Sequence, residues 1–469
     1  MVTIRTRNYG LSHSVGRNVF DYLGPLTRLL GTPKGMFGAV AFFAMVLYAV
    51  SSRNGKKFLI FLATLTGMVG YYHSIYWNNT LIGPLETFRG FCKPLFVVAI
   101  ALLAARYMRD RSGMPNGSLP AGAVAFITLE LLFVLRVMFI APERTAGALV
   151  LITMLFLGVL QYIRRSVWTP EDFISLLCAC VTASLVFFGL STIQLIFGPP
   201  DRIVINGRFT GLSDNPQHVA EAGACIFLMA AYVLTSGAAS RGQRLLCLVG
   251  AAVLVPFMVW TGSRTGAGMT AVGLLVLNRA KFKRWVGLAI LGAVSFKIYS
   301  YFSPAASAIA SRLGSTADTR IKGWLIALSA FVRHPLFGRP GLTVITESSV
   351  LSVAAALGIV GLAVFAVMVL ALFNDLSFVY RNRGRLDEED RKMCEFICAF
   401  AAAFFAGSFF DAYLLAIATS AAVFMGMILA FTSIARAKIN ASLMEYNEPV
   451  DAYAAQEPPV LEAGIPALS

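Results

Sequence analysis

Charged residues are scarce in this sequence. Aspartate, glutamate, lysine and arginine make up 13% of its 469 residues, about half the share of a soluble globular chain, whereas hydrophobic residues make up 57%. The apolar residues gather into runs long enough to cross a bilayer. This composition excludes a soluble globular fold and indicates a membrane protein.

Acidic residues are scarcer than basic ones. There are 24 acidic and 39 basic side chains, and the formal net charge is +15. In a soluble protein such a surplus favours nucleic-acid binding. Here lysine and arginine collect in short loops between apolar runs, as they do on the cytoplasmic side of membrane proteins, so no nucleic-acid partner is expected.

Metal-binding patterns are lacking as well. The seven cysteines form no CxxC pair and lie mostly inside apolar runs, which predicts small packing residues rather than zinc ligands. We expect no metal and no cofactor from the sequence. No small-residue cleavage site follows the first apolar run, so a cleavable signal peptide is not expected either.

The apolar runs predict an all-α, polytopic integral membrane protein with about 12–13 transmembrane helices, since about 20 apolar residues make one span. A basic segment over 1–35 precedes a single transmembrane domain over 36–436, and the polar residues over 437–469 predict a disordered cytoplasmic tail. The expected spans are 36–51, 58–77, 91–108, 120–140, 145–163, 172–198, 219–236, 244–262, 264–279, 285–302, 349–373, 393–412 and 414–435.

The loops between these spans alternate in charge, which predicts their sides of the membrane. The basic loops, expected in the cytoplasm, are 53–57, 106–111, 164–165, 241–244, 279–284 and 381–392. The loops 198–218, 261–266 and 303–347 then face outward. The basic segment 1–35 fits this scheme poorly when the span count is odd, so the side of the N-terminus stays open.

Several arginines nevertheless lie in the outward loops. They are Arg208, Arg264, Arg312, Arg320 and Arg333. A guanidinium group stays charged in a low dielectric and matches phosphate oxygens, so these residues favour a pyrophosphate presented at the outer leaflet. The alternative is pairing with lipid headgroups or with acids such as Glu86 and Glu221. Arg264 lies between two apolar helices, where a cation is costly unless it has a buried role.

The long outward loop has local structure of its own. Apolar residues recur at helical spacing between Asp318 and Arg333, which predicts a short helix lying on the membrane surface, and Pro335 ends it. His334 lies at the end of that helix. Glu347 stands at the mouth of the next span, where partial burial raises the pKa of a carboxyl group and makes it a candidate base. The alternative for Glu347 is an ordinary helix N-terminal acid.

Four segments of this region, taken in order, resemble the O-antigen polymerase and O-antigen ligase family of lipid-linked glycan transferases. They are Gly207-Arg208-Phe209-Thr210-Gly211 with Asp214-Asn215-Pro216; Thr261-Gly262-Ser263-Arg264-Thr265-Gly266; Arg320 and Trp324 with His334-Pro335-Leu336-Phe337-Gly338; and Glu347-Ser348-Ser349-Val350-Leu351 with Leu357-Gly358-Ile359-Val360-Gly361. Together they cover about 206–361.

The resemblance implies an all-helical glycosyltransferase of the bacterial inner membrane with its active site facing the periplasm. The donor in this family is an undecaprenyl-diphosphate-linked oligosaccharide, whose glycan moves to an acceptor hydroxyl with inversion and without a metal. Carried onto this chain, Arg264 and Arg320 are the leading pyrophosphate contacts, with Arg208 a third. A chain-length regulator and a flippase are implied as partners.

One position departs from the family pattern. Ligases of this family usually carry a histidine where this chain has Glu347. Three readings stay open: Glu347 is the base, His334 reaches in from the loop, or no strong base is needed.

The leading prediction is a polysaccharide polymerase that joins lipid-linked repeat units. An O-antigen ligase, with lipid A-core as acceptor, is the alternative within the family. A polysaccharide transporter or flippase is the alternative outside it, because Glu130 and Arg136 place charge within one span.

Overall fold

A computed structural model gives the fold. It describes residues 51–52, 54–70, 81–109, 119–140, 142–213, 215–277, 320–339, 348–414 and 419–447, together with Tyr48 and Ser307. The predictions for segment 1–35, Arg312, Glu347 and the tail after residue 447 lie outside the described residues. The chain divides into two units, Met1–Lys56 and Lys57–Ser469, and the account below concerns the second.

The described residues are almost entirely helical, which confirms an all-α polytopic membrane protein. Seven of their helices are long and apolar enough to cross a membrane. They are Gly83–Arg109, Leu149–Ser166, Pro170–Phe197, Pro216–Thr235, Arg241–Thr261, Ser349–Arg385 and Ser420–Met444. The expected total of about 12–13 spans stays a prediction, because 1–47 and 278–306 fall outside that search.

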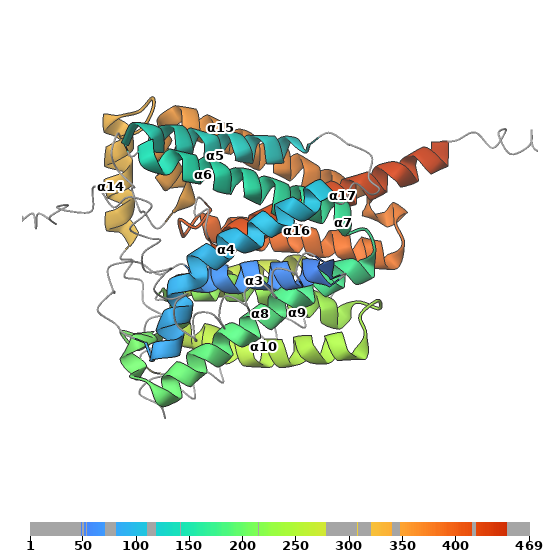
Figure 1. Cartoon of the computed structure of the whole chain (residues 1–469). Helices are drawn as coiled ribbons and strands as arrows, with labels where there is room; N and C mark the ends of the chain where they lie inside the picture. The colour runs from blue at the N-terminus through green and yellow to red at the C-terminus, as the bar shows by residue number, and fades with distance from the viewer. Residues whose placement is uncertain are drawn as a thin grey trace, which may run out of the picture. The chain divides into compact units, whose positions relative to one another are not determined.

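The helices follow one another along the chain with short connections (Figure 1). They are α3 (Gly55–Val69), α4 (Gly83–Arg109), α5 (Ala121–Ile140), α6 (Pro142–Leu155), the π-helix η2 (Phe156–Gln161), α7 (Tyr162–Ser166), α8 (Pro170–Phe197), α9 (Pro216–Thr235), α10 (Arg241–Thr261), α11 (Arg264–Leu277), α14 (Arg320–Arg333), α15 (Ser349–Asn382), α16 (Glu388–Ser408) and α17 (Ser420–Asn447). Between α8 and α9, strands β1 (Val204–Ile205) and β2 (Arg208–Phe209) form a small hairpin.

Helix ends in this region follow from local sequence. Thr169 caps α8 by accepting the Asp172 N–H, and Asn215 caps α9 by accepting the Gln217 N–H. A proline follows each cap, at the position where its missing N–H costs nothing. Ser240 and Gln243 form a reciprocal capping box at the start of α10. The helix boundaries therefore come from identifiable caps.

The two ends of the helices differ in character (Figure 1). The hairpin, the turn between α10 and α11, and α14 lie at one end, on the left of the view. The turns α9–α10 and α15–α16 lie at the other end and contact each other through Glu389. The predicted basic loops 241–244 and 381–392 thus share one end of the protein, away from α14.

A break in α15 joins that helix to the end of α14. Gly358 has φ +64°, so the helix is interrupted there. The segment after α14 fills the break: the Ile359 N–H donates to the Pro335 carbonyl at 2.7 Å, and the Arg339 N–H donates to the Ala355 carbonyl at 2.9 Å. Two of the motifs quoted from the sequence, His334–Gly338 and Leu357–Gly361, are therefore one structural unit.

Arg136 of α5 completes this unit. Its guanidinium group donates to the Ala356 and Arg339 carbonyl oxygens, which the break leaves without helical partners. An arginine within an apolar helix is costly unless it is satisfied. Arg136, one of the two charges that suggested a transporter, thus has a structural explanation.

We predict that Gly358→Ala destabilises the protein. A Cβ atom at this position would lie 2.4 Å from the Leu336 carbonyl oxygen, and the positive φ adds strain. We expect the variant to lose about 2 kcal/mol or more of unfolding free energy, seen as a lower midpoint of thermal unfolding in detergent. Gly189→Ala, within α8 and with open space around the position, is the control. Equal midpoints for both variants would contradict the assignment.

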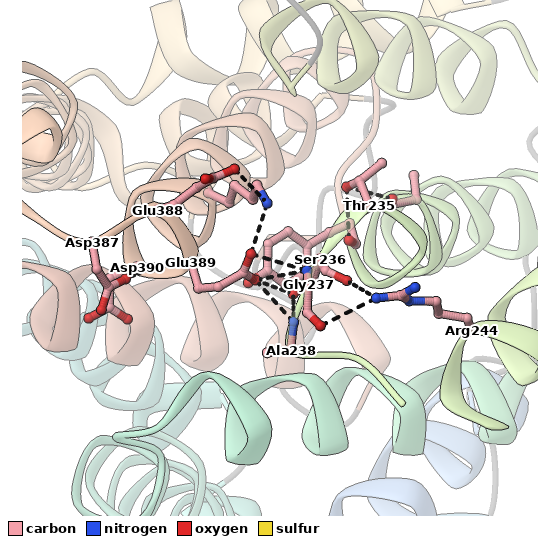
Figure 2. A network of polar contacts seen from close by, with 12 residues as sticks. Thr235, Ser236, Gly237, Ala238, Arg244, Asp387, Glu388, Glu389 and Asp390 are labelled. Carbon is pink, nitrogen blue, oxygen red and sulfur yellow. Dashed lines mark hydrogen bonds and ion pairs between the residues drawn. The ribbon is translucent and has the colours of Figure 1, made fainter. Parts of the chain in front are cut away.

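At the opposite end, Glu389 in the polar first turn of α16 holds the α9–α10 turn (Figure 2). Its carboxylate accepts the Ser236 hydroxyl at 2.5 Å, the Gly237 N–H at 3.1 Å and the Ala238 N–H at 3.4 Å. Lys392 adds an ion pair at 2.8 Å. Partial burial works to raise the pKa of Glu389, but these donors outweigh it and hold the pKa at about 2, below its ordinary 4.5.

We predict that this contact stabilises the protein above pH 4.5 and is lost as the pH falls toward 2, because the folded state then takes up a proton less readily than the unfolded state. The midpoint of thermal unfolding of Glu389→Gln should lie below that of the wild type at neutral pH, and the gap should narrow through this window. Glu388→Gln, whose carboxylate is mostly exposed, is the control. A gap that stays constant through the window would refute the prediction.

Candidate functional site

The hairpin places Arg208 over the end of α10. Asn206 and Gly207 both have positive φ, as a tight two-residue hairpin turn requires. Phe209 is fully buried against Phe257 and Trp260, with ring centroids 4.6 and 5.5 Å away. With its neighbour anchored, Arg208 donates from Nε to the Thr261 carbonyl at 2.6 Å.

The turn between α10 and α11 presents Arg264. Gly262 ends α10 in the left-handed conformation, and Ser263 accepts the Gly266 N–H to start α11. Gly266 packs so closely on α9 that a Cβ atom there would lie 2.6 Å from the Cβ of Ala220. Arg264 itself is exposed at the first position of α11, so its charge faces outward from a rigid turn.

Arg320 approaches the same place from α14. Its side chain is buried, with 8% of the residue exposed, and Nη2 donates to Thr265 Oγ1 at 2.9 Å. Arg264 and Arg320 both line a cavity of about 300 Å³. Its other lining residues are Thr265, Gly268, Met269, Val272, Ala406 and Phe410. Two arginines from different helices thus meet at one cavity.

Two buried carboxylates lie behind this cavity. Glu221 of α9 and Asp411, in the turn after α16, are each 5% exposed. The two carboxylates lie close enough for a hydrogen bond, and Arg320 is near enough to attract Glu221. His218 Nδ1 lies 3.2 Å from Glu221 Oε2. Met269 lines both the arginine cavity and a smaller one beside His218 and Glu221, so the two groups are neighbours.

The start of α15 is tied to the same acids. Ser349 Oγ donates to the Asp411 carbonyl at 2.8 Å and accepts the Leu414 N–H at 3.3 Å. Ser348 caps the helix by accepting the Leu351 N–H. The segment that follows Glu347 in sequence is therefore held against the turn that carries Asp411.

The remaining candidates are placed differently. Arg333 and His334 are exposed at the C-terminal end of α14 and are not among the residues that line the arginine cavity. Arg208 is half-buried and bonded to the Thr261 carbonyl, three residues before Arg264. Arg312 and Glu347 lie outside the described residues, so both stay predictions.

Sequence reasoning did not assign a role to Glu221 with Asp411. Glu221 was considered only as a possible ion-pair partner for an outward arginine. The signal was present, because an acid inside an apolar span marks a functional position by default. What the sequence could not give is the pairing, since 190 residues of chain separate the two carboxylates.

No protein-family model matches the sequence, and no curated protein matches it significantly. The family resemblance therefore stays a prediction that rests on the quoted motifs.

We predict that Thr265→Val lowers the thermal stability of the protein. The change keeps the shape of the side chain but removes the acceptor of a buried arginine, which costs about 1–3 kcal/mol. Thr265→Ser keeps the hydroxyl and should retain most of the wild-type unfolding midpoint. The bond to Arg320 would have no structural weight if valine and serine gave the same midpoint.

Proposed function

We propose that the protein is a polysaccharide polymerase of the bacterial inner membrane. It transfers a growing glycan from undecaprenyl diphosphate to a hydroxyl group of the next lipid-linked repeat unit, on the periplasmic side. The observation that carries the proposal is the meeting of Arg264 and Arg320 at one cavity.

The chemistry of the reaction suits this pair. Negative charge grows on the diphosphate as the sugar leaves, and guanidinium groups already in place stabilise that charge without reorganising. Arg320 is held by Thr265, and Arg264 by the first turn of α11. Both are therefore positioned before a substrate binds, and Arg208 supplies further positive charge nearby.

The position of the site supports an outward-facing reaction. The cavity lies at the end of the helices that carries α14, away from the basic turns at 241–244 and 381–392. By the positive-inside rule those turns lie in the cytoplasm. The opposite end then opens toward the periplasm, where lipid-linked repeat units are presented.

Apolar surfaces beside the arginines suit a lipid-linked substrate. A groove of about 320 Å³ runs between α9, α10 and α11, from Gly262 and Ser263 to Leu274. Ser263 precedes Arg264, so a prenyl chain in this groove leads its diphosphate to the arginines. The exposed apolar face of α14, with Ile321, Leu325, Leu328 and Val332, suits contact with the membrane itself.

The polymerase is favoured over the other candidates for specific reasons. Glu347, in place of the histidine usual in ligases, argues against transfer to lipid A-core. Arg136, which suggested a transporter, instead satisfies carbonyl groups at the break in α15. A chain-length regulator and a flippase remain proposed partners on the family resemblance.

We predict that Arg264→Ala and Arg320→Ala each abolish polymer formation by purified protein supplied with lipid-linked repeat units, without ATP or an ion gradient. Arg264→Lys should also be impaired, because lysine offers a point charge in place of a fork. Arg241→Ala, exposed at the other end of the protein, should keep wild-type activity. Wild-type polymer from both alanine variants would remove the assignment.

A further inference from the structure

Three metal-ligating side chains converge beside the arginine cavity. His218, Glu221 and Asp411 each offer a ligand atom, and these atoms all lie within 4.8 Å of one another. They come from two separate parts of the chain, the first turns of α9 and the turn after α16. One cation could therefore be reached by all three.

The carboxylates are left without donors. Glu221 Oε1 and Asp411 Oδ2 are both buried and have no hydrogen-bond partner among the described residues. A buried acceptor in this state costs free energy, and two adjacent carboxylates also repel each other. Asp411 Oδ1 accepts only its neighbour's N–H, from Ala412. These oxygens require a positive partner that the arrangement of side chains does not itself supply.

Two partners could meet this need: a proton shared between the carboxylates, or a metal ion. A shared proton satisfies the two oxygens but makes no use of His218, whose Nδ1 faces Glu221 at 3.2 Å. Adjacent ligands of a tetrahedral ion at about 2.1 Å lie about 3.4 Å apart, close to that separation. A neighbouring cavity of about 20 Å³, lined by His218 and Glu221, is large enough for one water-sized ligand.

We propose that His218, Glu221 and Asp411 bind one divalent transition-metal ion, Mn²⁺ or Zn²⁺. A neutral imidazole and two carboxylates compensate the charge of such an ion, and these nitrogen and oxygen donors suit both metals. Two ligands of one ion are at most about 4.4 Å apart, so the ligand atoms need to approach by only a few tenths of an ångström.

The ion also explains how Arg320 stays available to a substrate. Without it, Glu221 attracts the guanidinium of Arg320. With it, both carboxylates are neutralised, and the charge of Arg320 is left to the diphosphate. This second step rests on the proposed function, whereas the metal site does not. It departs from the metal-free chemistry that the family resemblance implies.

The test uses the full chain, purified in detergent and stripped with EDTA. The protein is incubated with MnCl₂, ZnCl₂ or MgCl₂, desalted, and its metal content measured by mass spectrometry alongside its thermal unfolding midpoint. We expect one equivalent of Mn²⁺ or Zn²⁺ per chain and a raised midpoint, because a ligand that binds only the folded state stabilises it. No lipid substrate is present, so failure of the polymerase proposal leaves this result intact.

Variants decide whether these side chains are the ligands. Glu221→Gln and Asp411→Asn should lose the bound ion, whereas Glu130→Gln, another buried acid in an apolar helix, should retain it. His218→Cys, at the least buried ligand, should shift preference toward Cd²⁺ because a thiolate is a softer ligand. Wild-type protein that takes up neither metal would overturn the proposal and leave a shared proton. Unchanged stoichiometry in both acid variants, or unchanged preference in His218→Cys, would overturn it too.

Discussion

The compensation of buried charge is the constraint on which this structure depends. An apolar interior tolerates a guanidinium or a carboxylate only when a partner satisfies it. Arg320 meets this condition through Thr265, and Arg136 through the carbonyl groups at the break in α15. The acids Glu221 and Asp411 meet it only in part. The charges that remain incompletely compensated all gather around one cavity, which is why that cavity is the candidate site.

The two ends of the helices solve the same problem differently. Away from the cavity, Glu389 receives donors from Ser236, Gly237 and Ala238, and Lys438 pairs with Asp390 at 2.5 Å. Those charges are matched, and they fasten helices together. At the cavity end the backbone is instead shaped by glycines, at the hairpin, the α10–α11 turn and the break in α15. One end thus holds the fold, and the other presents charge to a ligand.

Much of this arrangement could be predicted from the sequence, but unevenly. The expected spans 172–198, 219–236 and 244–262 lie within a few residues of α8, α9 and α10, and the expected loop helix is α14, because apolar periodicity and caps are local signals. The pairing of Glu221 with Asp411 and the docking of Pro335 against Ile359 could not be predicted. They depend on how distant helices pack, which no local pattern encodes.

The central claim is that Arg264 and Arg320 hold a lipid-linked diphosphate at the end of the protein that carries α14. The most direct measurement is photocrosslinking with a prenyl-diphosphate analogue whose reactive group sits beside the phosphates, followed by mapping of the labelled peptides. The account predicts label on the first turns of α11 and α14. Label confined to the turns at 236–244 or 381–392, or label undiminished by excess inorganic diphosphate, would contradict it.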